Sequence, residues 1–299
     1  MAVERSGEQY ARVGDLDLCY ETFGDRAMPA LLLVMGLGSQ MLLWQEDFCD
    51  QLAERGFWVI RFDNRDVGRS TILRDTHVPT RLELVLRDSR AAAYALSDMA
   101  NDAAGLLDWL EIDAAHVVGA SMGGMIAQLL AIGHPPRVLS LVSIMSTTGD
   151  RRVGQAHPQL LWRLFRRPPR DREHYVREFI ANYRYIGARR YPPDPEHTRT
   201  LAERCFDRGI HRAGTARHLA AIATAPDRTA MLREVRVPTT VIHGDADRLV
   251  MSSGGRATAS AIPGARLVLV PGMAHDLPRE LWGQLISEIE RTAAQAAAV

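Results

Sequence analysis

A serine held between two glycines carries the strongest chemical signal in the sequence. Gly119-Ala120-Ser121-Met122-Gly123 follows the apolar run His116 to Val118 and precedes a stretch with apolar residues at helical spacing. A G-x-S-x-G pattern between a strand and a helix is typical of a nucleophile elbow, a tight turn whose glycines relieve steric crowding. We predict that Ser121 is a nucleophile, the alternative being a structural turn with an idle serine.

A nucleophilic serine needs a general base and an acid that orients the base. After an elbow of this kind the acid and then the histidine follow along the chain. His275 comes soon after the apolar run Leu267 to Val270, and Asp245 and Asp247 follow the run Thr239 to His243. We predict His275 as the base. The residues alone do not decide whether Asp245 or Asp247 is the acid, since both lie at the same strand end.

His243 is the best rival for the base. It lies within an apolar run next to the acid candidates, where a buried histidine is more often a structural residue. It would also break the expected order along the chain.

The oxyanion of the reaction needs two hydrogen-bond donors. The backbone N–H of Met122, which follows the nucleophile, is expected to be one, and the loop after an earlier strand should supply the other. That loop is Met35-Gly36-Leu37-Gly38-Ser39, and we choose the N–H of Leu37. A dinucleotide-binding loop is the alternative, but Met41 stands where its third glycine belongs.

Short apolar runs alternate with helical patterns, which predicts an α/β fold with a mostly parallel sheet wrapped by helices on both faces. The expected helices are Asp98 to Leu110, Gly123 to Ile132 and Leu281 to Ala296. The expected strands are Leu16 to Phe23, Ala30 to Met35, Phe57 to Phe62, His116 to Ala120, Leu139 to Met145, Thr239 to His243 and Arg266 to Val270.

The alternation stops between residues 150 and 228. Arginines and aromatic residues are dense there, and Pro168-Pro169 and Pro192-Pro193 divide the stretch into several helices. We predict a helical cap at 150–228 inserted into an α/β core formed by 1–149 and 229–299. The cap is expected to roof a substrate cavity at the carboxyl ends of the strands; the alternative is a helical decoration away from the substrate.

Composition narrows the function classes. The 36 basic residues balance 36 acidic ones, which argues against a nucleic-acid partner. The basic residues are all arginine, which excludes Schiff-base chemistry on lysine. Three widely spaced cysteines form neither a disulfide framework nor a metal motif. With a charged N-terminal stretch and no membrane-spanning run, we expect a cytoplasmic protein without metal, cofactor or membrane association.

The sequence resembles the α/β-hydrolase superfamily over nearly its whole length, and within it the aclacinomycin methylesterases and related small carboxylesterases. The elbow carries the resemblance together with three stretches: Leu31 to Gly36, Asp63-Asn64-Arg65-Asp66-Val67-Gly68-Arg69-Ser70, and Ile262 to His275. The resemblance implies an eight-stranded, mostly parallel sheet, Asp247 as the acid, and oxyanion donors at Leu37 and Met122. This chain has Met35-Gly36 where the family often has a His-Gly pair.

The expected function is cleavage of a small-molecule carboxylic ester, apolar or bulky, through an acyl-enzyme intermediate. Lactonase, perhydrolase and carbon–carbon bond hydrolase activities are alternatives on the same three residues. A non-catalytic small-molecule receptor on the same scaffold is the alternative from another class.

Overall fold

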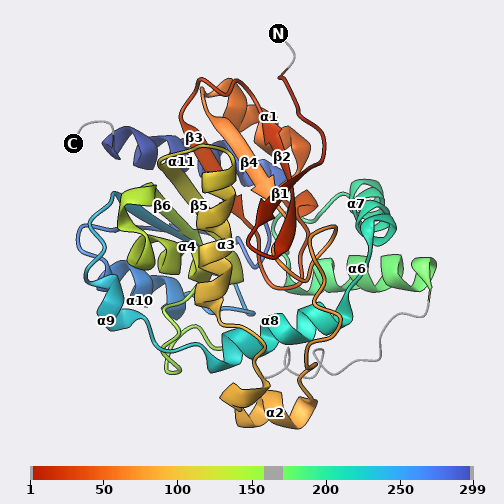
Figure 1. Ribbon diagram of the computed structural model, residues 1–299. Coiled ribbons are helices and arrows are strands. Elements are labelled where there is room, and N and C mark those ends of the chain that lie inside the picture. Colours follow the sequence, from red (N-terminus) through yellow and green to blue (C-terminus); the bar gives the residue numbers. More distant parts are fainter. Residues whose placement is uncertain (1–2, 158–170, 297–299) are drawn as a thin grey trace.

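An eight-stranded mixed sheet forms the centre of the computed structural model, which describes residues 3–157 and 171–296 (Figure 1). The strand order is β1-β2-β4-β3-β5-β6-β7-β8; the first two pairs in this order are antiparallel and every later pair is parallel. The predicted eight-stranded, mostly parallel sheet is thereby confirmed. The strands are β1 Gln9–Val13, β2 Leu16–Phe23, β3 Ala30–Val34, β4 Trp58–Phe62, β5 Ala115–Ala120, β6 Val138–Ile144, β7 Thr239–Gly244 and β8 Arg266–Val270.

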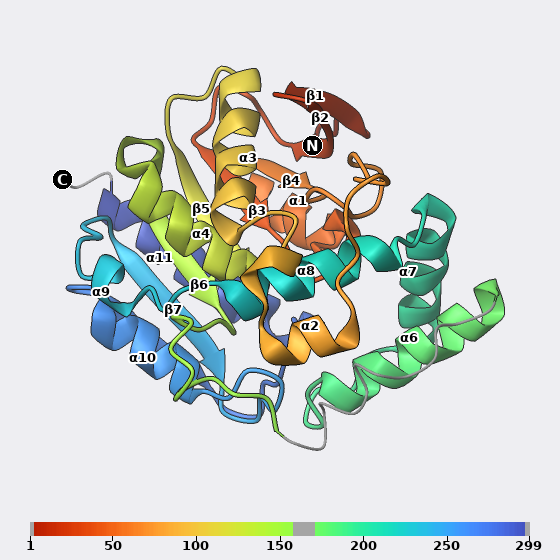
Figure 2. The same cartoon turned by 60° about the horizontal axis from the view of Figure 1, so that its bottom comes forward.

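Helices cover both faces of the sheet because successive strand side chains point to opposite sides. Leu31 and Leu33 pack with α1 and α11, whereas Leu32 and Val34 pack on the face of α3 and α4. Figure 2 shows these layers from a second direction. The covering helices are α1 Glu46–Glu54 and α11 Trp282–Ala296 on one face, and α3 Leu96–Trp109, α4 Met122–Gly133 and α10 Ser253–Ala261 on the other.

Seven strands begin and end within one residue of the positions predicted from the sequence, but β1 was not predicted. β1 is an edge strand with mostly exposed side chains, so it lacks the apolar run that marks the buried strands. The remaining short elements are α2 Arg81–Leu86, α9 Thr229–Leu232, and the 3-10 turns η1 Met41–Leu43, η2 Ser89–Ala91, η3 Pro135–Arg137 and η5 Arg279–Leu281.

In the described part of 150–228, where the sequence predicts helices, the structure has α6 Arg172–Ile186, α7 Pro195–Arg208 and α8 Arg212–Thr224. We call them the helical segment. They gather beside the end of the sheet where the parallel strands finish (Figure 1). The predicted break at Pro168-Pro169 lies outside the described residues, whereas Pro192-Pro193 separates α6 from α7. In the described parts of the chain, every helix is too short or too polar to cross a bilayer.

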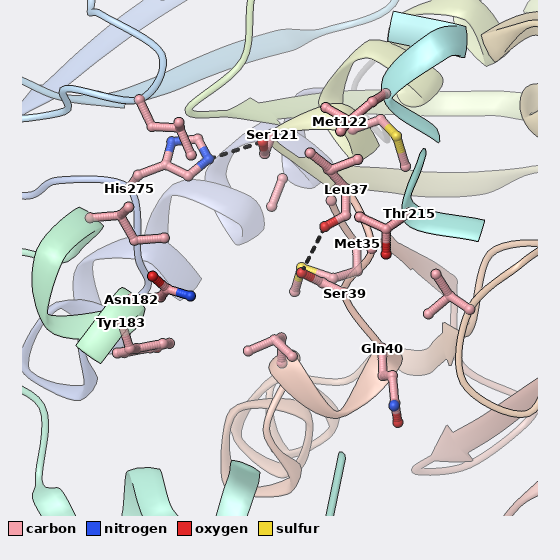
Figure 3. Close-up of a pocket in the computed structure, with 18 of the residues that line it drawn as sticks. Met35, Leu37, Ser39, Gln40, Ser121, Met122, Asn182, Tyr183, Thr215 and His275 are labelled. Atoms are coloured by element: carbon pink, nitrogen blue, oxygen red, sulfur yellow. Dashed lines mark hydrogen bonds between the residues drawn. The ribbon is translucent and has the colours of Figure 1, made fainter. Parts of the chain in front are cut away.

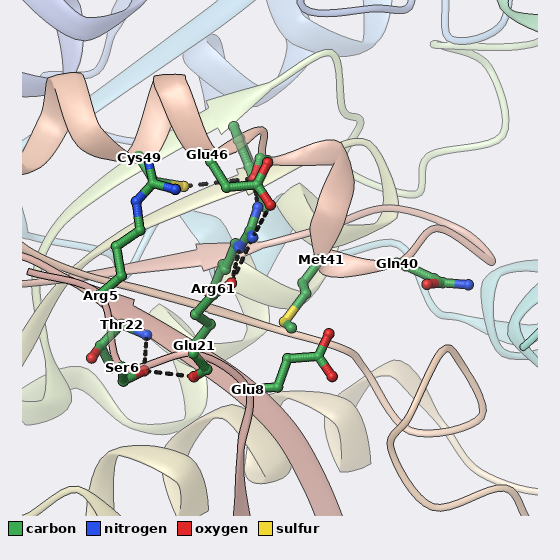
Figure 4. Close-up of polar contacts among 12 residues, drawn as sticks. Arg5, Ser6, Glu8, Glu21, Thr22, Gln40, Met41, Glu46, Cys49 and Arg61 are labelled. Atoms are coloured by element: carbon green, nitrogen blue, oxygen red, sulfur yellow. Dashed lines mark hydrogen bonds and ion pairs between the residues drawn. The ribbon is translucent and has the colours of Figure 1, made fainter. Parts of the chain in front are cut away.

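A buried arginine joins the first elements of the core. Arg61 of β4 is 1% exposed and lies 2.6 Å from Glu21 of β2 and 2.8 Å from Glu46 of α1. Its guanidinium also donates to the carbonyl of Trp44. Figure 4 shows Arg61 reaching Glu46 at the start of α1. Because a buried guanidinium must be paired, these contacts fix α1 and the preceding loop against the sheet.

Candidate active site

Ser121 stands at a strained turn between β5 and α4. Its backbone has φ 57° and ψ −121°, a conformation that costs free energy for a residue with a Cβ. Glycine is required on both sides: a Cβ at Gly119 would lie 2.2 Å from the carbonyl oxygen of Gly123, and one at Gly123 would lie 2.1 Å from that of Val34. The turn therefore packs tightly enough to hold the Ser121 side chain at the carboxyl edge of the sheet.

One hydrogen-bonded chain joins Ser121, His275 and Asp247. His275 Nε2 lies 2.9 Å from Ser121 Oγ, and His275 Nδ1 lies 2.8 Å from Asp247 Oδ2. Figure 3 shows the first of these contacts. The three residues follow β5, β8 and β7, whose carboxyl ends meet at one edge of the sheet. Because the carboxylate of Asp247 accepts a hydrogen bond from Nδ1, the ring proton lies on Nδ1 and the lone pair of Nε2 faces the Ser121 hydroxyl. General-base catalysis requires this arrangement.

The protein holds Asp247 as a carboxylate. Its Oδ1 accepts the backbone N–H groups of Leu249 at 2.8 Å and Val250 at 2.9 Å. Burial alone would raise the pKa of Asp247, but the charge of His275 and hydrogen bonds from His243, His275 and the backbone together lower it below its usual value. A stable negative charge at this position favours the cationic form that His275 takes when it accepts a proton.

The two alternatives from the sequence occupy other positions. Asp245 is exposed, and its Oδ1 accepts the N–H of Gly272 at 2.7 Å. His243 is fully buried; its Nε2 lies 2.7 Å from the carbonyl oxygen of Val250 and 3.5 Å from Asp247 Oδ2. Because a carbonyl only accepts, Nε2 carries a proton, and His243 supports the loop that carries Asp247.

Leu37 and Met122 lie beside Ser121 (Figure 3). Met122 is the first residue of α4, so its N–H has no partner within the helix. Within 3–157 and 171–296, no hydrogen bond engages the backbone N–H of either residue. A Cβ at Gly36 would lie 3.1 Å from Ser121 Cβ, which shows how closely the turn at residues 36–39 approaches the serine. Two backbone donors to which no described residue is hydrogen-bonded thus stand beside the hydroxyl.

Residues after β4 support this turn, a role that the sequence analysis did not predict. Asn64 Nδ2 donates to the carbonyl of Met35 at 3.0 Å, and Asp63 Oδ1 accepts the N–H of Met41 at 2.7 Å. Both belong to the stretch Asp63 to Ser70, which carries part of the resemblance to the α/β-hydrolase superfamily but implied no role for these residues. Two polar residues directly after a buried strand were the available signal, because buried polar groups need partners.

A cavity of about 790 Å³ opens above Ser121. This volume lies within the range of small-molecule sites, roughly 300 to 1,000 Å³. The core and the helical segment both contribute mainly apolar walls, from Met35, Leu43, Met125, Met145, Tyr175, Phe179, Tyr183, Leu219 and Ile222. In Figure 3, Asn182 and Tyr183 of α6 lie on the His275 side and Thr215 of α8 on the Leu37 side.

The His275 loop is tied to the end of α6. The N–H of His275 donates to the carbonyl of Ile186 at 3.1 Å, and the N–H of Ala188 donates to Asp276 Oδ1 at 3.0 Å. Burial raises the pKa of Asp276 to about 6. The helical segment therefore contacts the histidine loop directly. Among the described residues, no group of three or more His, Cys, Asp or Glu side chains could hold a metal ion.

Known proteins share this architecture. Residues 29–278 match the family described as alpha/beta hydrolase fold. Rhodomycin D methylesterase DauP from Streptomyces sp. (strain C5) is 28% identical over 285 residues, which cover 88% of this chain and 90% of that protein. 2-Hydroxy-6-oxononadienedioate/2-hydroxy-6-oxononatrienedioate hydrolase 2 from Pseudomonas putida is 26% identical over 283 residues, 91% of each chain. The enol-lactonase structure from Burkholderia xenovorans LB400 covers 97% of both chains, with 24% identity and a TM-score of 0.70.

Proposed function

The chain belongs to the α/β-hydrolase fold family, and from this premise we propose that it is a serine hydrolase that cleaves a carboxylic ester through an acyl-enzyme intermediate. The observation that carries the proposal is the hydrogen-bonded series Ser121–His275–Asp247, of which Ser121 and His275 line an apolar cavity. The 28% identical methylesterase, matched over most of both chains, supports the ester as the bond attacked.

The geometry supports each step of the reaction. Ser121 Oγ attacks the ester carbonyl while His275 Nε2 takes the hydroxyl proton, and the N–H groups of Leu37 and Met122 stabilise the oxyanion. As the tetrahedral intermediate collapses, the C–O bond breaks and the alcohol leaves with the proton from His275. Water then attacks the acyl-enzyme in the same way, which releases the acid and restores Ser121. Asp247 holds His275 in one orientation throughout.

The substrate we propose is a bulky apolar ester. The cavity walls are mainly apolar, so burial of an apolar acyl or alcohol group contributes binding free energy, at roughly 25 cal/mol per Å² removed from water. Tyr175, Phe179 and Tyr183 form part of the wall from α6. The helical segment acts as a cap in this proposal and excludes water from the reacting groups.

A panel of 4-nitrophenyl esters of increasing acyl size, methyl esters of bulky acids, and lactones tests the proposal. The wild type should favour bulky esters over 4-nitrophenyl acetate in kcat/KM, and Ser121→Ala should lower kcat by at least about 10⁴-fold with an unchanged melting temperature. Near-full activity in Ser121→Ala would refute the nucleophile. A lactone preferred over every open ester would replace the ester proposal, and an inactive wild type that binds these compounds would favour a receptor.

A further inference from the structure

His218 of α8 connects the helical segment to the turn that carries Leu37. Its side chain is fully buried. Nδ1 lies 3.1 Å from the backbone nitrogen of Gly38, and Nε2 lies 2.8 Å from the carbonyl oxygen of Arg65. A carbonyl only accepts and an N–H only donates, so Nε2 carries the proton and Nδ1 presents its lone pair to Gly38. Burial also lowers the pKa of His218 to about 4, which keeps the ring neutral.

Among the described residues, hydrogen bonds engage the other polar groups of the turn around Leu37 but not its own N–H. The carbonyl of Gly36 accepts the N–H of Ser39 at 3.2 Å, and the carbonyl of Leu37 accepts the Ser39 hydroxyl at 3.3 Å. The N–H of Gly38 donates to Nδ1 of His218. The peptides on both sides of Leu37 are thus fixed, and its N–H has no partner in the described part of the chain.

The helix that carries His218 is itself rigidly placed. A Cβ at Gly214 would lie 2.0 Å from the carbonyl oxygen of Asp66, so the two backbones are in contact. Arg217 makes two hydrogen bonds of 2.7 Å to Asp66, and both side chains are fully buried. A Cβ at Gly38 would lie 2.7 Å from Thr215 Oγ1. The imidazole therefore approaches the turn from a fixed support rather than from a loosely packed helix.

We propose that His218 is a positioning residue, which aims the N–H of Leu37 at the oxyanion by holding the Gly38 peptide through Nδ1. The helical segment then shapes the oxyanion site as well as the cavity. The inference rests on the proposed ester hydrolysis. No pattern along the chain indicates this role, because Gly38 and His218 are 180 residues apart.

Two amide variants separate the contacts of the ring. His218→Asn places its amide oxygen near the position of Nδ1, so it can accept from Gly38 but cannot reach Arg65. His218→Gln places its amide nitrogen near the position of Nε2, so it can donate to Arg65 but leaves Gly38 without its acceptor. Loss of a whole oxyanion donor costs about 10² to 10³ in kcat. Since His218→Gln only misorients the donor, we expect kcat to fall about 10- to 100-fold with KM within about 3-fold, whereas His218→Asn stays within about 3-fold of wild type.

Melting temperature and amide hydrogen exchange at Gly38 complete the test. Faster exchange at Gly38 in His218→Gln than in His218→Asn, with the kcat difference above, is the expected result. Equal kcat in the two variants, or losses that follow the melting temperature, would overturn the positioning role. A wild type without ester hydrolysis would refute the proposed function and with it the catalytic part of this inference. The exchange comparison still decides whether His218 holds the turn: equal exchange at Gly38 in the two variants contradicts it.

Discussion

Replacing Asp247 by asparagine tests how the site controls the proton on His275. The side chain introduced by Asp247→Asn keeps an oxygen to accept the N–H groups of Leu249 and Val250, which in the wild type bond to Oδ1. Its amide nitrogen takes the place of Oδ2 and donates to His275 Nδ1, 2.8 Å away. The ring proton then sits on Nε2, facing Ser121, and His275 cannot accept the hydroxyl proton. A wrong tautomer of this kind lowers kcat about 10⁴-fold, or about 5 kcal/mol of transition-state stabilisation.

Asp245→Asn is the matched control, because the sequence alone did not separate the two acids. Asp245 is exposed and its amide replacement can still accept the N–H of Gly272, so kcat should stay within about 2-fold of wild type, as for an ordinary surface substitution. Steady-state hydrolysis of the best ester in the panel, with melting temperatures for both variants, measures the difference. The assignment of Asp247 as the acid would be refuted if Asp245→Asn lost more kcat than Asp247→Asn. It would also be refuted if Asp247→Asn kept more than a tenth of the wild-type kcat.

Three further substitutions test the surroundings of the site. Burial raises the pKa of Asp276 from 3.8 to about 6, so the stability that this group contributes is fully present below pH 4 and is lost as the pH rises through 6. Asp276→Asn should therefore be more stable than wild type at pH 8, by up to about 3 kcal/mol, and equal to it at pH 4; urea unfolding that shows a less stable variant at pH 8 would contradict this. Gly123→Ala places a Cβ 2.1 Å from the carbonyl oxygen of Val34 and should cost at least about 2 kcal/mol in thermal unfolding, whereas an unchanged melting temperature would argue against the close contact. Arg217→Met leaves the buried carboxylate of Asp66 unpaired and should cost about 3 to 5 kcal/mol in urea unfolding; a loss under about 1 kcal/mol would show that water reaches the pair.

The sheet and the elbow could be predicted from the sequence because local rules determine them. Buried strands read as apolar runs, and the glycines around Ser121 reflect a steric demand within a few residues of the chain. β1 was not predicted, because an exposed edge strand needs no apolar run. The boundaries of the predicted cap at 150 and 228 stay predictions.

The details of the site depend on contacts that the sequence does not encode locally. Asp245 and Asp247 differ in the structure because the N–H groups of Leu249 and Val250 donate to the carboxylate of Asp247 and hold it inside the protein. That choice depends on the path of the loop, which no spacing rule specifies. No local pattern could predict the role of His218, since its partner Gly38 lies in a distant part of the chain.

The proposed mechanism requires that His275 activates Ser121. Intact mass after exposure to a fluorophosphonate, followed by peptide mapping, measures this activation in the wild type and in His275→Ala. We expect stoichiometric labelling at Ser121 in the wild type, because the hydroxyl lies 2.9 Å from His275 Nε2, and almost none in the variant. A folded wild type that stays unlabelled, or a His275→Ala variant that labels as fast as wild type, would contradict it.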